Sequence, residues 1–188
     1  IFSRWYGISL TLTKSTTANT FDYAITLTDY GENGVGVPAI VDSVSGSITH
    51  AALYADTSLY AGFQGLAQGG GQNGVFAFDN FSVTQDAVYD EFDDGQAEFN
   101  ASFTSTASGQ FATAGIPGWN ANFGLGSPNS GSIRTGGNNN AAIHNTAIDF
   151  SDAGTSSTVS IFFKPRVDTG STDTAFDTGR LAVGFTTD

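Results

Sequence analysis

Two short segments of this chain alternate strictly between apolar and small polar residues, and this pattern constrains the fold most. In Ile8–Thr13 every second residue is aliphatic and its neighbours are Ser or Thr, and Tyr23–Thr28 repeats the alternation. Successive side chains of a β-strand point to opposite faces, so each segment predicts a strand with one buried and one solvated face. The polar stretch between them predicts an antiparallel hairpin with a longer loop.

The composition favours an all-β fold. Of the 18 acidic residues only Glu32, Glu91 and Glu98 are Glu and 15 are Asp, and turn-forming residues replace the usual helix formers. The 16 Phe residues suit a core between two sheets. Further strands are predicted at Ser47–Tyr54, Ser58–Phe63, Val75–Thr84, Phe99–Thr104, Thr158–Lys164 and Arg180–Phe185. We therefore predict an antiparallel two-sheet β-sandwich of roughly 10 to 14 strands.

Charge and cysteine content exclude several classes of function. The net charge is −12 with six Lys and Arg, which argues against nucleic-acid binding because phosphate neutralisation needs clustered cations. Without Cys the chain has no disulfide, thiolate metal site or thiol nucleophile. No segment has the length of a membrane span, and we expect no membrane span. The missing Met and leader predict a processed or internal portion of a longer, extracellular or cell-surface product.

A natural junction lies near residue 86. Phe78–Thr84 has the pattern of a closing strand, and Tyr89–Gly95 has that of an opening strand. We therefore predict that residues 1–86 form the C-terminal half and residues 87–188 the N-terminal half of a single domain. The chain is either a circular permutation with adjacent termini or one period of a longer array.

Several aromatic strand segments carry a family resemblance. Phe76–Thr84, Asp90–Gly95 with the later Gly118-Trp119, and Trp5–Leu12 are the segments concerned. They resemble the last strand, the first strand with its Trp-bearing partner, and a central strand of laminin-G-like, concanavalin-type jelly rolls. The resemblance covers nearly the whole chain when residues 87–188 are read before residues 1–86. It implies a jelly-roll sandwich but no particular activity, since this fold includes lectins, glycanases, lyases and spacers.

The acidic cluster at Asp90–Asp94 suggests a calcium site. It contains four carboxylates in five residues, and calcium prefers oxygen ligands. In jelly rolls that this chain resembles, a structural calcium often joins the first strand to the last. The resemblance implies Asp79, Asp93 and Asp94 as the ligands of a structural Ca2+. The alternative is a solvated edge whose charges prevent association between sheets.

Catalytic patterns are missing from the sequence. Glycoside hydrolysis needs two carboxylates at a fixed separation, and no Glu-x-Asp-x-x-Glu run occurs. The only histidines are His50 and His144, and neither lies in a Gln-x-His strand typical of lyases of this fold. We interpret His50 as a hydrogen-bonded strand residue and His144 as a surface or loop residue.

The sequence contains aromatic residues that could bind glycans and two sequons that could carry them. Aromatic side chains that could form a sugar platform are Trp5, Tyr6, Tyr30, Tyr60 and Trp119, although Trp5 and Trp119 are expected in the core. Two sequons predict N-glycosylation at Asn80 and Asn100.

These patterns predict a non-enzymatic extracellular structural or adhesive module, with copies of itself as partners in a tandem array or filament. A carbohydrate-binding module is the alternative, and a polysaccharide hydrolase or lyase is a third hypothesis. The array is preferred over the permuted monomer. In either arrangement we expect the Ile8–Thr13 strand beside Arg180–Phe185.

Overall fold

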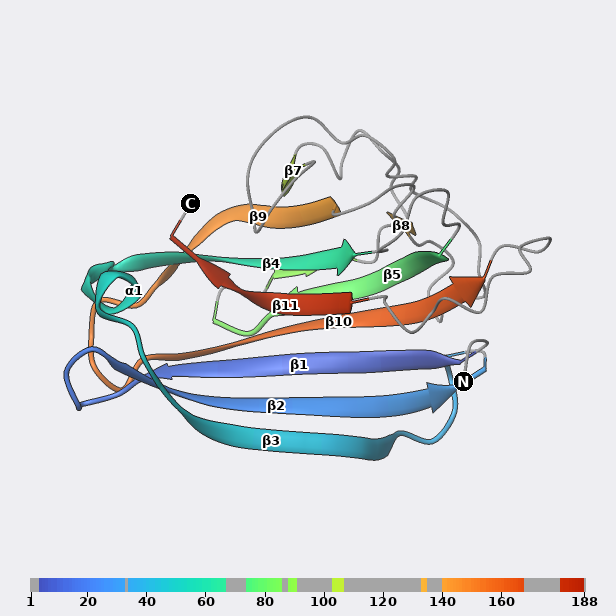
Figure 1. Ribbon diagram of the computed structural model, residues 1–188, viewed down its shortest axis with the longest axis horizontal. Coiled ribbons are helices and arrows are strands. Elements are labelled where there is room, and N and C mark those ends of the chain that lie inside the picture. Colours follow the sequence, from blue (N-terminus) through green and yellow to red (C-terminus); the bar gives the residue numbers. More distant parts are fainter. Residues whose placement is uncertain are drawn as a thin grey trace.

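The chain forms two antiparallel β-sheets that face each other, which confirms the predicted all-β sandwich (Figure 1). The computed structural model describes residues 4–32, 34–66, 74–85, 88–90, 103–106, 133–134, 140–167 and 180–187. Within these residues there are eleven strands and one helix of five residues.

The larger sheet has seven strands in the order β3-β2-β1-β10-β5-β6, with β8 also paired to β5. Its strands are β1 (Trp5–Lys14), β2 (Thr20–Gly31), β3 (Ala39–Thr49), β5 (Gly74–Val83), β6 (Val88–Asp90), β8 (Ile133–Arg134) and β10 (Ser156–Val167). The predicted hairpin is confirmed, because β1 and β2 pair antiparallel with Leu10 opposite Ile25.

The smaller sheet has four strands in the order β11-β4-β9-β7. They are β11 (Arg180–Thr186), β4 (Ser58–Leu66), β9 (Asn140–Asp149) and β7 (Phe103–Thr106). The expected neighbourhood of Ile8–Thr13 and Arg180–Phe185 within one sheet is wrong. Strand β1 lies between β2 and β10, whereas β11 pairs with β4 in the opposite sheet. The apolar alternation of both strands suits either sheet, so it did not specify the partner.

The predicted strand Ser47–Tyr54 is partly wrong. Strand β3 ends at Thr49, and helix α1 (Ala51–Ala55) follows it. His50 is the N-cap of this helix rather than a strand residue, and its Nδ1 accepts a hydrogen bond from the Leu53 amide at 3.1 Å. This cap satisfies an amide that the first helical turn leaves without a partner. The helix connects β3 of the larger sheet to β4 of the smaller one.

Strands on the two sides of residue 86 are combined in both sheets. The segment predicted as a closing strand lies in β5, and the start of the predicted opening strand lies in β6. These two strands pair directly, with Phe81 opposite Asp90. The larger sheet combines β6, β8 and β10 with four strands from before residue 86, and the smaller one combines β7, β9 and β11 with β4. The start of β1 and the end of β11 lie at opposite ends of the sandwich (Figure 1).

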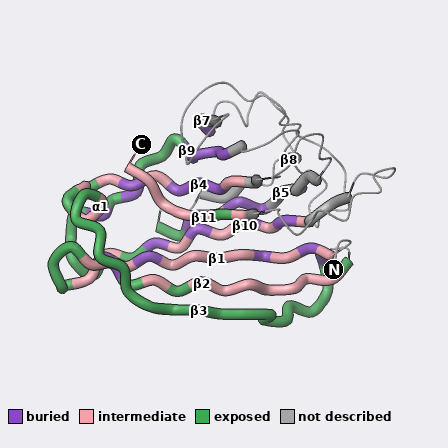
Figure 2. Tube along the Cα trace, viewed as in Figure 1, coloured by how far each residue is buried: buried purple, intermediate pink, exposed green. Residues whose placement is uncertain are grey.

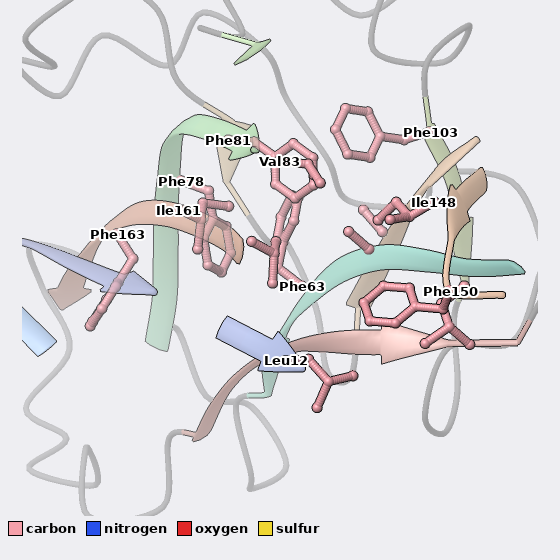
Figure 3. Packing of buried hydrophobic residues seen from close by; sticks show 14 of the residues in the cluster. Leu12, Phe63, Phe78, Phe81, Val83, Phe103, Ile148, Phe150, Ile161 and Phe163 are labelled. Atoms are coloured by element: carbon pink, nitrogen blue, oxygen red, sulfur yellow. The ribbon is translucent and has the colours of Figure 1, made fainter. Parts of the chain in front are cut away.

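Aromatic rings packed at tilted and edge-on angles form the core between the sheets. Phe63 of β4 is fully buried, and its ring lies 4.9 Å from Phe78, 5.7 Å from Phe81 and 5.9 Å from Phe103, measured between centroids (Figure 3). Phe78 and Phe81 belong to the larger sheet and Phe63 and Phe103 to the smaller. The cluster therefore joins the two layers, as the abundance of Phe predicted.

A buried lysine closes the end of the sandwich near α1. The side chain of Lys14 is 5% exposed, and its Nζ donates to the carbonyl of Phe150 at 2.7 Å. A second, longer contact reaches the carbonyl of Asp56 at 3.4 Å, and the ammonium lies 4.7 Å from the ring centroid of Tyr54. One cation thus joins β1 to two loops, and its charge is satisfied by carbonyl oxygens and a ring face.

The outer face of the larger sheet carries rows of hydroxyl groups. Thr11 and Thr158 approach to 2.7 Å across β1 and β10, and Ser82 and Ser160 to 2.7 Å across β5 and β10. Near the start of β1, the rings of Tyr30 and Phe162 pack at a tilt above Gly7, with their centroids 4.3 Å apart. A Cβ at Gly7 would lie 2.8 Å from the Tyr30 ring, so glycine makes room for this aromatic pair.

Candidate functional site: an uncovered end of the larger sheet

The larger sheet extends beyond the smaller one on one side. The outermost strand of the smaller sheet, β11, contacts β1 and β10, so β2 and β3 lie past its edge. All eleven residues of β3 are exposed, and Figure 2 shows the strand green along its whole length. We call the inner faces of β1, β2 and β3 that β11 does not cover the overhang.

Cross-strand register shows which side chains form the overhang. Residues directly opposite each other in an antiparallel pair share a face. Leu10 lies opposite Ile25, and Ile25 lies opposite Val44, so these three form one apolar row. Ile48 lies opposite the fully buried Phe21, which places Ile48 on the same inner face. Val44 is nevertheless 54% exposed and Ile48 49% exposed, because no second layer covers them.

A groove of about 300 Å³ opens between the overhang and β11. It is lined by Leu10, Leu12, Tyr23, Ile25, Ile48, Leu53, Gly184 and Phe185. Apart from the Tyr23 hydroxyl, the side chains that line it are apolar. The groove can therefore bind apolar surface.

The surroundings of the overhang are apolar and nearly uncharged. Within β3 the only charged residue is Asp42, opposite Leu27, in a chain whose net charge is −12. Further exposed apolar side chains precede or begin the strand, namely Val35, Val37, Ile40 and Val41. Exposed apolar patches bounded by polar residues mark interaction surfaces more often than single apolar residues do.

The sequence contains a signal for β3 that the predicted strand Ser47–Tyr54 includes only in part. Val44–Thr49 has the same alternation as the two hairpin strands, with Ser45 and Ser47 between inner-face positions. Gly46 interrupts the apolar series because a Cβ there would lie 2.9 Å from the Tyr23 hydroxyl. Alternation could have located β3, but it could not show that the opposite sheet stops short of it.

The predicted calcium ligands remain untested. Asp79 lies in β5 opposite Phe162, while Asp93 and Asp94 lie outside the described residues. Among the residues with described placement, no group of three or more His, Asp or Glu could hold a metal ion. The calcium site therefore stays a prediction.

Neither predicted glycosylation site is tested, and of the two only Asn80 lies among the described residues. Asn80 lies in β5 with φ of 51° and is 7% exposed. A glycan on Asn80 would have to displace the packing around that side chain. Asn100 lies outside the described residues, so a glycan there stays a prediction.

The aromatic candidates for a sugar platform are distributed over the fold. Trp5 is fully buried, as expected, and Tyr6 stacks on Phe163 with ring centroids 5.7 Å apart. Tyr30 packs against Phe162 on the outer face, and Tyr60 is partly buried in β4. Trp119 lies outside the described residues.

The expected surface position of His144 is wrong. This residue lies in β9, a strand that the sequence analysis did not predict, and it is 8% exposed. Its ring stacks on Phe81 at 5.8 Å and contacts Phe103 edge-on at 5.1 Å. Its Nδ1 accepts a hydrogen bond from the Thr146 amide at 3.2 Å. The packing makes His144 part of the aromatic core rather than of a loop.

Charge pairing is found at the end of β2, where Asp29 is located. Arg4 Nε donates to the Asp29 carboxylate at 2.8 Å, and the Gly31 amide donates to it at 2.7 Å. These hydrogen bonds hold the pKa of Asp29 below its ordinary value. Nearby, partial burial lowers the pKa of Lys164, whose Nζ donates to the Glu32 carbonyl at 3.2 Å.

Asp29 is expected to give the fold a modest pH dependence. Because its folded pKa is lowered, the carboxylate stabilises the fold above its ordinary pKa of 3.8, and this contribution is lost as pH falls through the folded pKa. Asp29→Asn should therefore lower the melting temperature at about pH 6 but not at about pH 2, with a small effect because the pair is exposed. A difference that persists unchanged at low pH would contradict the assignment.

No described helix is long and apolar enough to cross a membrane. Comparison with protein-family models and with curated proteins gives no match.

Proposed function

We propose that this chain is a structural or adhesive β-sandwich module, extracellular or on the cell surface, whose neighbours are copies of itself. The overhang is the observation that supports this function. A strand of eleven exposed residues with apolar side chains on one face costs free energy in water, and covering it recovers that free energy.

The chemistry of the groove also favours association over catalysis. Its lining offers apolar surface and one phenol hydroxyl, and the exposed apolar residues continue beyond it onto β3. Among the described strands β3 is outermost in its sheet, which adds an unpaired strand edge to the apolar face. Such edges pair with other chains unless charge or shape prevents it.

Self-association should depend on protein and salt concentration. We expect sedimentation-velocity profiles of the purified chain to shift to larger species between about 10 and 500 μM, as for a small interface. Raising NaCl from about 20 to 500 mM should strengthen association, because screening reduces repulsion between acidic chains while apolar contacts persist. A monomer at every concentration and salt level would contradict the proposal.

Two assays separate this function from the alternatives of the sequence analysis. A glycan array tests carbohydrate binding, and release of reducing ends or unsaturated products tests polysaccharide cleavage. Turnover that is lost when one Asp or Glu is replaced would overturn the structural assignment.

A further inference from the structure

We propose that the overhang binds the overhang of a second copy, face to face across a two-fold axis that runs along the strands. This inference rests on the proposed self-association and specifies its surface and geometry. The same patch from each copy forms both sides of such an interface, which is the usual arrangement in homodimers.

The shape of the sandwich supports this arrangement. Because β2 and β3 lie past the edge of β11, the sandwich is one sheet thick at the overhang and two sheets thick beside it. Facing sheets pack about 10 Å apart, so the layer beside β11 and above the overhang has space for a single additional sheet. A second copy turned about the axis places its own overhang in that space. Each overhang then supplies the layer that the other lacks.

The distribution of apolar side chains favours a protein surface over a small apolar ligand. The groove is lined by Ile25 and Ile48, but Val44 lies outside its lining and is 54% exposed. A small molecule in the groove would leave Val44 in water. A facing sheet would cover Val44 together with Ile25 and Ile48.

The charge distribution favours a copy of the same chain. A basic partner would be drawn to the many carboxylates elsewhere on a chain of net charge −12, not to this face. The apolar row Leu10, Ile25 and Val44 carries no charge, so two copies can approach there with the least repulsion. Asp42, opposite Leu27 further along β3, is the charge that such contact has to accommodate.

The size of the face sets the expected affinity. Eleven residues at about 3.3 Å each and three strands at about 4.8 Å each give a face of at most about 500 Å² per copy, since β11 covers part of β1. The two copies together bury at most about 1,000 Å², at the lower limit for a specific interface. We therefore expect a weak dimer with a dissociation constant on the order of 10–100 μM.

Adjacent positions on opposite faces of β3 provide the test. Val44 faces inward, and Ser45, opposite Ala24, faces outward. Val44→Glu should raise the dissociation constant at least about tenfold in sedimentation equilibrium, whereas the control Ser45→Glu should change it less than about threefold. Both sites are exposed, so circular dichroism should show an unchanged fold.

Cross-linking gives a second readout, because the chain has no Cys of its own. Val44→Cys should form dimers with a bifunctional maleimide at concentrations where the chain associates, and Ser45→Cys should form few. Equal cross-linking of the two variants would indicate edge pairing through β3 and overturn the face-to-face geometry.

The outcomes distinguish this inference from the function on which it rests. If the wild-type chain associates but Val44→Glu has no effect, self-association stands and this interface is wrong. If the wild-type chain remains monomeric throughout, both fail. A monomer whose groove takes up an apolar dye would identify a ligand groove instead and would overturn the inference.

Discussion

Phe63→Ala is expected to lower the free energy of unfolding by about 3–5 kcal/mol, the range for deleting a fully buried ring. Phe63 is fully buried and contacts rings of both sheets, including Phe78 and Phe103. Its removal leaves a cavity between layers that are held together chiefly by side-chain packing. Urea unfolding followed by fluorescence would measure the loss, with the m-value as a check that the transition stays two-state.

Phe162→Ala is the matched control for this prediction. Phe162 is also a strand Phe with an aromatic neighbour, but it lies partly exposed on the outer face beside Tyr30. Its removal opens no cavity between the sheets, so we expect less than half the effect. Equal losses for the two variants would show that the Phe63 cluster does not join the layers as described.

Lys14→Met is expected to cost about 2–4 kcal/mol, from the loss of charge-assisted hydrogen bonds and a cation–π contact. The Phe150 carbonyl would lose the donor that lies 2.7 Å away, and the methionine side chain of similar length offers no replacement. Thermal melts of wild type and variant measure the loss, and a domain of this size shifts by about 2–4 °C per kcal/mol.

Thr13→Ala is the control at the neighbouring position. Thr13 lies on the opposite face of β1, and its hydroxyl donates to Ser156 in an exposed hydrogen bond of 3.0 Å. A change within about 0.5 kcal/mol is expected there. A Lys14→Met variant as stable as wild type would mean that the two loops hold this end without the ammonium.

Strand alternation predicted much of the fold, because it records which side chains face a core. It located β1, β2, β4, β5, β10 and β11 within a few residues of their bounds. It did not place β11 in the opposite sheet from β1, because an alternating strand fits any sheet that buries one of its faces. Strand β9 was missed because Asn145 and Thr146 interrupt its apolar run, and its single histidine resembled a loop residue.

The candidate site could not be predicted, for a related reason. The inward positions of β3, such as Val44 and Ile48, are apolar like the core positions of β1. Exposure depends on the width of the opposite sheet, and that width depends on long-range pairing that local patterns do not encode. Only the three-dimensional arrangement distinguishes a core position from an uncovered one.

The positions of the strand ends limit how joined copies could assemble. Strand β1 starts and β11 stops at opposite ends of the sandwich, so copies fused by a short linker would follow one another lengthwise (Figure 1). The overhang instead lies on the flank, and each copy has one. Two such strings could therefore pair side by side through their overhangs into a ribbon of double width, in which both overhangs are covered. Through this surface, growth would be open-ended in length and limited to two strings in width.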